Sequence, residues 1–530
     1  MFIDTAGTVS ANATSTVTLR QTTNGQAINL GAADSSGTLG LTDAELDRVT
    51  AGTVQIGNAS SGAITFSANI TRATNTNINL TTGANNNIAL STFSLNAGSG
   101  GDVTLTTSGS GKITTGDTTG TDITGGKLTL LTGAGAGSAT NPLRTQVSNL
   151  EAVGGTGGVF VSNTGNLTIG GIGATNGVSA TNAAITISAA SSITATEPIS
   201  SGGGNVSLSA TTDVTLSGAN ADVTTGGGSF TVDADSDDNG SGTFTSDNAG
   251  SAVAASGGAI SITAADVALT GTLAGTSTLK FVPSQSNSTI GIGASATGTL
   301  NISDTELGNL ADGFSSITIG DATSGTGAVD VNSSTFTDPV TIVGGSIAVT
   351  ELNAGSNAVT LTARSTNITD GGNGGSDVVA SSLTLSASSG IGDGDALETA
   401  VPTLSFSNTT NAVQVTNTLA GGLTASGTNA GTGTVSITET SGNLTVGAAD
   451  IVTNSGAVNL TASGTNKSVN SASSSDVVTN NSGSGAAVTW TADNMNLGGN
   501  ITAGTGVVTL KQSTNNTTID LGSTAGPTNG

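Results

Sequence analysis

The chain lacks several residue types on which catalytic sites depend. It has no cysteine, histidine or tyrosine, and aromatic residues make up 2% of its 530 positions. Without cysteine and histidine there are no disulfides, no Ser-His-Asp or Cys-His catalytic groups and no zinc sites of the usual kind. The enzyme class left open is a carbohydrate-active β-helix enzyme that works with carboxylates and a nearby base. Acidic residues are scattered singly, and sugar-stacking aromatics are scarce, so we expect no enzyme.

Positive charge is also scarce. The chain has 10 basic and 35 acidic residues, with a formal net charge of −25. Phosphate recognition needs clustered lysine and arginine, so this balance argues against nucleic acid as a partner and against anionic membrane surfaces. No run of about 18 apolar residues is present, so we expect no membrane span in this segment. Residues 1–5 lack the basic and apolar regions of a signal peptide, so we expect an export signal outside it.

Glycine and short apolar residues are abundant instead. The chain contains 80 glycines, and 35% of its residues are hydrophobic. Valine, isoleucine and leucine recur regularly in apolar-x-apolar doublets, which argues against low-complexity disorder. A period of two indicates strands with one buried face, and the glycine, asparagine and serine residues between them favour tight turns. The pattern predicts an all-β fold, a parallel β-solenoid (β-helix) that forms a single elongated rod.

The doublets also assign a register. We expect their apolar members to be buried and their middle residues to be exposed. The predicted core includes Ile64, Phe66, Val103, Leu105, Val206, Leu208, Ile260 and Ile262, and the predicted exposed positions include Thr65, Thr104, Ser207 and Ser261. Trp490 alternates in register with Val488, and we interpret it as a filler of the core or of a corner.

Two short segments have the pattern of a helix. Residues 41–49 offer Thr42 or Asp43 as a cap with Glu45 in the first turn, and residues 302–310 repeat the pattern. This recurrence is one sign of a long internal repeat. A second sign is that Leu143, Val147, Leu150, Val159 and Val161 match Leu397, Val401, Leu404, Val413 and Val415 in order.

The repeats divide the chain. Residues 1–16 end a preceding coil, 17–277 form the first long repeat, 278–507 form the second, and 508–530 begin a third copy. The third copy is indicated by the segments 508–515 and 519–522, which restate 17–24 and 28–31. We therefore expect the chain to be an internal fragment of a longer array.

Residues 41–52, 54–59, 141–150 and 159–165 resemble the giant repetitive proteins related to filamentous haemagglutinin. The resemblance extends over nearly the whole chain. It implies a bacterial, right-handed parallel β-helical stalk exported to the cell surface, acting in adhesion or biofilm, with a host or a neighbouring cell as partner. It thus implies an extracellular location and a structural function in surface attachment. The alternative is a self-assembling filament or sheath subunit whose partners are copies of itself, and an enzyme is the third alternative.

The sharpest chemical motif is acidic. Asp235, Asp237 and Asn239, followed by Gly240, match the first half of an EF-type calcium loop, but Ser246 stands where a glutamate would close it. We interpret residues 233–240 as an acidic turn, with calcium binding as the alternative and no other cofactor expected. The segments 370–374 and 393–395 are weaker matches to calcium-binding patterns, and we interpret both as turns.

Overall fold

The computed structural model describes residues 7–247, 252–372, 374–479 and 484–515. Outside these ranges lie residues 1–6 of the predicted segment 1–16 and residues 516–530 of the predicted third copy. Asn373, part of the weaker calcium match at 370–374, also lies outside them. The described chain consists mainly of short strands, and each pairs in parallel with the strand one coil before or after it. This arrangement is a parallel β-solenoid, which confirms the all-β class predicted from the doublets.

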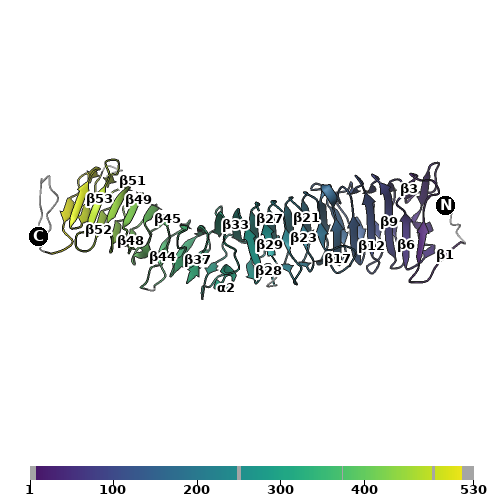
Figure 1. Ribbon diagram of the computed structural model, residues 1–530, viewed down its shortest axis with the longest axis horizontal. Helices are drawn as coiled ribbons and strands as arrows, with labels where there is room; N and C mark the ends of the chain where they lie inside the picture. The colour runs from purple at the N-terminus through teal and green to yellow at the C-terminus, as the bar shows by residue number, and fades with distance from the viewer. Residues whose placement is uncertain (1–6, 248–251, 373, 480–483, 516–530) are drawn as a thin grey trace. The chain divides into compact units, whose positions relative to one another are not determined.

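The chain forms two compact units. Unit 1 consists of Met1–Leu279 with Asn309–Gly313, and unit 2 of Lys280–Gly308 with Phe314–Gly530. The division falls within β33 (Thr278–Pro283). Within each unit the strands stack as successive rungs, as β21, β27 and their neighbours do in unit 1 (Figure 1).

Unit 1 has several strand ladders. The longest follows β2 (Thr16–Leu19), β6 (Thr53–Gly57), β9 (Asn77–Ala84), β12 (Val103–Ser108), β15 (Lys127–Leu131), β17 (Asn149–Val153), β19 (Leu167–Ile169), β22 (Ile193–Ala195), β25 (Val214–Leu216), β28 (Thr243–Ser246) and β31 (Asp266–Leu269). A second follows β8 (Ile70–Thr71), β11 (Leu95–Asn96), β14 (Ile123–Thr124), β16 (Leu143–Gln146), β18 (Val159–Asn163), β21 (Ile185–Ala189), β24 (Val206–Ala210), β27 (Phe230–Ala234) and β30 (Ile260–Ala264).

Shorter ladders complete unit 1. One joins β4 (Thr38–Leu41), β3 (Ala27–Leu30), β7 (Ile64–Phe66), β10 (Ile88–Ser91) and β13 (Ile113–Thr115). Another starts at β17 and joins β20 (Val178–Ser179), β23 (Ile199–Ser200), β26 (Val223–Thr224), β29 (Ala252–Ala255) and β32 (Thr272–Gly275). The strands β1 (Val9–Ser10) and β5 (Val49–Thr50) form a separate pair.

Unit 2 is built in the same way. One ladder follows β36 (Ser316–Ile319), β39 (Val340–Gly344), β42 (Ala358–Ala363), β45 (Ser382–Ala387), β47 (Thr403–Asn408), β49 (Leu423–Asn429), β51 (Leu444–Thr453), β53 (Ser468–Ser471) and β56 (Asn494–Leu497), and β51 also leads to β54 (Val477–Val478) and β57 (Ile501–Thr502). A second follows β38 (Ser334–Thr335), β41 (Leu352–Asn353), β44 (Val378–Val379), β46 (Leu397–Ala400), β48 (Val413–Asn417), β50 (Val435–Glu439), β52 (Val458–Ala462), β55 (Val488–Thr491) and β58 (Val508–Lys511). A third joins β35 (Leu300–Ile302), β34 (Ile290–Ile292), β37 (Ala328–Val331), β40 (Ser346–Val349) and β43 (Ile368–Asp370).

The core lies inside the coils. All eight predicted core residues are buried, from Ile64 to Ile262, because alternate side chains of each strand point inward and stack on those of the next coil. Trp490 is also fully buried, in register with Leu460 and Leu510, which confirms its interpretation as a core filler.

The outward positions correct the sequence prediction. Thr65, Thr104, Ser207 and Ser261 are half-buried rather than exposed. Each lies in a column, as Thr186, Ser207, Thr231 and Ser261 do, and the coils are only about 4.8 Å apart. The residues of the adjoining coils therefore cover part of each side chain, although Thr186 and Thr231 in the same column remain exposed.

The two predicted helices are present. They are α1 (Asp43–Leu46), with Thr42 as N-cap, and α2 (Asp304–Leu307), with Ser303 as N-cap. Both have a complete capping box, which confirms the prediction for residues 41–49 and its repeat. No helix in the described ranges has the length and hydrophobicity needed to cross a membrane.

Glycines allow the coils to approach at corners. Gly204, Gly228 and Gly258 lie on successive coils. A Cβ on Gly228 would lie 2.1 Å from the carbonyl oxygen of Gly204, and a Cβ on Gly258 would lie 2.0 Å from that of Gly228. Such distances leave no room for a side chain. The high glycine content therefore follows from the stacking as well as from the turns.

Candidate metal centre

The predicted calcium residues lie in the turn between β27 and β28. Asp235 is fully buried, and its two carboxylate oxygens accept hydrogen bonds from the backbone N–H groups of Asn239 (3.1 Å) and Gly240 (2.7 Å). Asp237 and Asn239 are exposed, and the Asn239 side-chain amide donates to Asp237 Oδ2 (3.0 Å). The structure thus brings all three residues into one hydrogen-bonded turn, and calcium binding by them stays a prediction.

Like charges crowd this turn. Burial raises the pKa of Asp233, and the nearby carboxylates of Asp238 and Asp235 raise it further. The close spacing of acids that the sequence indicates is therefore present. Asp235, however, directs its oxygens at backbone donors of its own turn.

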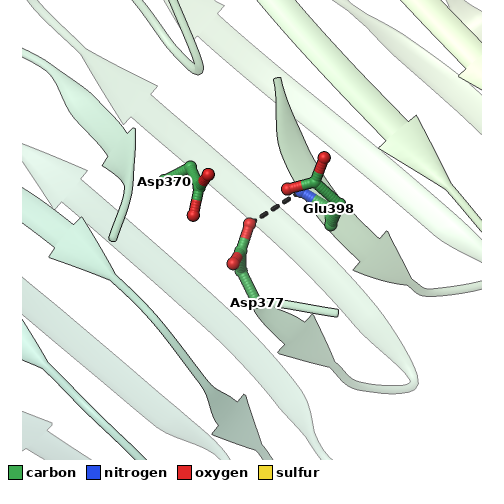
Figure 2. Close-up of side chains that lie close together, drawn as sticks. All are labelled: Asp370, Asp377 and Glu398. Atoms are coloured by element: carbon green, nitrogen blue, oxygen red, sulfur yellow. Dashed lines mark hydrogen bonds between the residues drawn. The ribbon is translucent and has the colours of Figure 1, made fainter. Parts of the chain in front are cut away.

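A different set of carboxylates comes together in unit 2. Asp370 is the last residue of β43, Asp377 directly precedes β44, and Glu398 lies in β46 on the next coil. One carboxylate oxygen from each lies within 4.8 Å of the other two. Figure 2 shows the three carboxyl groups turned toward one another at this corner of the solenoid.

Asp377 is the buried member of the cluster. Its Oδ2 accepts a hydrogen bond from the backbone N–H of Glu398 (2.7 Å), as the dashed line in Figure 2 shows. Its Oδ1 is buried and has no hydrogen-bond partner within the described chain. Asp370 and Glu398 are half-buried, and Asp370 Oδ1 accepts from the Gly372 N–H (2.7 Å). A fully buried carboxylate with one unused oxygen is costly, because water is no longer there to solvate it.

The electrostatics of the cluster disfavour three free charges. Burial raises the pKa of Asp377 to about 8, and the charges of Asp370 and Glu398 contribute to the rise. Burial also raises the pKa of Glu398, as do the charges of Asp370 and Asp395. The corner therefore holds a proton or a cation more readily than an isolated carboxylate does.

Sequence reasoning found only part of this cluster. Asp370 belongs to the weaker calcium match, whereas Asp377 and Glu398 carry no motif of their own. Glu398 reaches the cluster only because β46 pairs with β44, in the register Val378 to Thr399. Asp393 and Asp395, the other weak match, are exposed in the turn before β46.

The donor set suits a hard cation. Ca²⁺ takes oxygen ligands at about 2.3–2.6 Å, so two oxygens on one ion lie at most about 5 Å apart. The three oxygens meet this limit. Zinc prefers nitrogen and sulfur ligands, which this chain cannot supply from histidine or cysteine.

The chain matches no family model, no curated protein and no solved structure.

Proposed function

We propose that this chain is a structural segment of an extracellular bacterial stalk that holds an attachment surface away from the cell. The observation that carries the proposal is the bonding between coils. Asparagine and aspartate side chains at the corners accept hydrogen bonds from backbone N–H groups one full coil later. These bonds add to the parallel ladders of the strands.

The spacing of these bonds is 25 residues over residues 77–127 of unit 1. Asn77 accepts from the N–H of Asp102, and Asp102 in turn accepts from that of Lys127, each 25 residues further on. Asn85 and Ser110 form a bond of the same spacing, and so do Asn87 and Lys112. The coils of this stretch are therefore bound to one another by side chains at equivalent corner positions.

Unit 2 uses buried polar side chains for the same purpose. Asn417 accepts from Thr399 Oγ1 (2.8 Å) and donates to Glu439 Oε2 (2.6 Å), so one side chain links three successive coils. Asn408 accepts from the Gly390 N–H and donates to Asn429 Oδ1. Columns of this kind stabilise a stack along its length, which is the property that a stalk requires.

The resemblance to filamentous-haemagglutinin-related proteins supports the extracellular part of the proposal. It suggests a host or neighbouring cell as the partner of the parent protein. The residues 41–52 that contribute to it include α1, whose capping box recurs in α2 of unit 2.

One observation favours a second candidate, a self-assembling filament subunit. On the last described coils, Leu497, Val507, Val508 and Leu510 are exposed by 42 to 69%. β58 pairs only with β55 in the part of the chain that the structure describes. An apolar strand whose outer edge has no partner strand can add a coil from a second molecule.

Electron microscopy of the purified chain at increasing concentration tests both candidates. A stalk segment gives separate rods of one length at every concentration. A filament subunit gives fibres that lengthen with concentration and that disappear in a Val508→Lys, Leu510→Lys variant. Compact, non-elongated particles would contradict both.

A further inference from the structure

The acidic corner of unit 2 has an equivalent in unit 1. Residues 113–125 align without a gap with 368–380, so that Ile113, Thr115 and Asp122 match Ile368, Asp370 and Asp377. Residues 143–147 likewise align with 397–401, which matches Arg144 with Glu398.

The backbones of the two corners make the same hydrogen bonds. Asp122 Oδ2 accepts from the N–H of Arg144 (2.8 Å), as Asp377 Oδ2 accepts from that of Glu398 (2.7 Å). The Asp122 N–H donates to the Arg144 carbonyl and the Asp377 N–H to the Glu398 carbonyl, both at 2.8 Å. The strand registers also agree, since β14 pairs with β16 as β44 pairs with β46.

The side chains differ at the second carboxylate oxygen. In unit 1, Asp122 Oδ1 accepts from Thr115 Oγ1 (2.8 Å) and lies 3.3 Å from a guanidinium nitrogen of Arg144. In unit 2 the position of Thr115 is held by Asp370, and that of Arg144 by Glu398. Both donors are thus replaced by carboxylates.

The consequence is visible at Asp377. Its Oδ1 is equivalent to Asp122 Oδ1, the oxygen that contacts both Thr115 and Arg144. In Asp377 this atom is buried without a hydrogen-bond partner in the described chain. Three other fully buried acids, Glu151, Asp235 and Glu439, have donors at both carboxylate oxygens. Glu439, for example, accepts from the Asn417 side chain and from the backbone N–H groups of Ser441 and Gly442. Asp377 instead faces two further acids.

We propose that Asp370, Asp377 and Glu398 bind a divalent cation, with Ca²⁺ the ion of best fit, which takes the place that the Arg144 guanidinium has in unit 1. The ion supplies in unit 2 the positive charge that the Arg144 side chain supplies at the equivalent corner of unit 1. Water fills the coordination positions that the carboxylates leave. Ca²⁺ is favoured over Mg²⁺ because it accepts an irregular oxygen set, whereas Mg²⁺ requires near-ideal octahedral geometry.

The bound ion links two coils. Asp370 and Asp377 flank the turn between β43 and β44, and Glu398 belongs to β46 on the following coil. Calcium therefore stabilises this contact in unit 2, as the Arg144 ion pair does in unit 1. The inference does not depend on the stalk function.

Isothermal titration calorimetry of the full chain, after EDTA treatment and dialysis, tests the site with CaCl₂ as the probe. We expect binding with a Kd on the order of 10⁻⁴ to 10⁻³ M, the range of extracellular calcium modules, and a higher melting temperature in calcium than in EDTA. Asp377→Asn keeps the shape of the side chain and should weaken binding at least tenfold. Asp393→Asn, on the exposed turn nearby, is the matched control and should leave the affinity unchanged.

A second test exchanges the side chains of the two corners, so that the result does not depend on a single variant. Asp370→Thr with Glu398→Arg installs the unit 1 residues in unit 2, and should abolish calcium binding while raising the melting temperature in EDTA. Thr115→Asp with Arg144→Glu installs the unit 2 residues in unit 1, and should add a second binding event. The proposal is overturned if wild-type protein shows no heat and no melting shift up to 10 mM CaCl₂, or if calcium binding persists unchanged in both Asp377→Asn and the Asp370→Thr, Glu398→Arg variant.

Discussion

Units 1 and 2 each have an aspartate at the equivalent corner of the solenoid, but the side chains around its carboxylate differ in charge. Asp122 has a threonine hydroxyl and an arginine beside its inner oxygen, whereas Asp377 has two carboxylates nearby and no hydrogen-bond donor to that oxygen within the described residues. The backbone hydrogen bonds are the same in both. The comparison shows that the coil specifies where the buried acid lies, while its neighbours on the adjoining strands decide what neutralises it.

The largest expected effect comes from Arg144→Glu. It leaves Asp122 buried beside a second acid and without its counter-ion, and should lower the free energy of unfolding of unit 1 by about 3–5 kcal/mol. Chemical denaturation, followed by hydrogen exchange of the β14 and β16 amides, measures the loss. Arg364, exposed and bonded to the carbonyls of Ala322 and Thr323, provides the control, because Arg364→Ala should cost less than about 1 kcal/mol. Similar losses in both variants would show that Arg144 contributes no more than a surface arginine.

A third buried acid sharpens the comparison because backbone N–H groups stabilise it, with one longer bond from the Thr175 hydroxyl (3.4 Å). Glu151 accepts four hydrogen bonds of 2.6–2.8 Å from the N–H groups of residues 172–175. Burial by itself would raise the pKa of Glu151, but the four N–H donors together lower it below its ordinary value. Glu151→Gln should cost about 1.5–3 kcal/mol through the loss of charge-assisted hydrogen bonds.

The lowered pKa of Glu151 determines how its contribution to the stability of unit 1 changes with pH. The stabilisation is present above the unfolded pKa of about 4.3 and is lost as the pH falls through the lower folded value. Hydrogen exchange at residues 172–175 between pH 5 and pH 2 should show this loss in the wild type and not in Glu151→Gln. Glu351→Gln, an exposed control, should shift stability by less than about 0.5 kcal/mol. A 172–175 loop that stays equally protected at low pH would contradict the assignment.

Thr115→Val should have a smaller effect, about 1.5 kcal/mol, on unit 1. The change removes the hydroxyl donor to Asp122 Oδ1 but leaves Arg144 beside that oxygen. Thr114→Val, at the neighbouring half-buried outward position, is the matched control and should be close to neutral. If the two variants melt alike, the hydroxyl of Thr115 is not needed to hold the aspartate.

The smallest expected effect is that of Asp237→Ala on the calcium response. Asp237 is exposed and bonded to the Asn239 amide, whereas Asp377 is buried with an unused oxygen. Asp237→Ala should therefore change stability by less than about 0.5 kcal/mol and leave the calcium-dependent melting shift in place. A shift that vanishes in Asp237→Ala and survives in Asp377→Asn would assign the ion to residues 233–240 instead.

Features set by neighbours in the chain were predictable. The alternation around Val206 and Leu208 correctly predicts which side chains are buried, because a strand exposes alternate residues to opposite faces. The caps Thr42 and Ser303 are correctly placed for the same kind of reason, since a capping box spans four residues. The half-burial of Thr104 was missed, because it depends on the coils above and below.

The sequence by itself determined the strand character, the inward residues and the two capped helices of this protein, since each is encoded over a few neighbouring residues. Only the tertiary structure decided that Glu398 reaches Asp377, because the coils vary in length and the partner strand across a coil is fixed by stacking. It likewise decided that both carboxylate oxygens of Asp235 accept hydrogen bonds from backbone N–H groups, whereas Oδ1 of Asp377 has no hydrogen-bond partner in the described chain. Burial and hydrogen-bond partners are properties of the stacked coils, and they separate two acidic turns that look alike in the sequence.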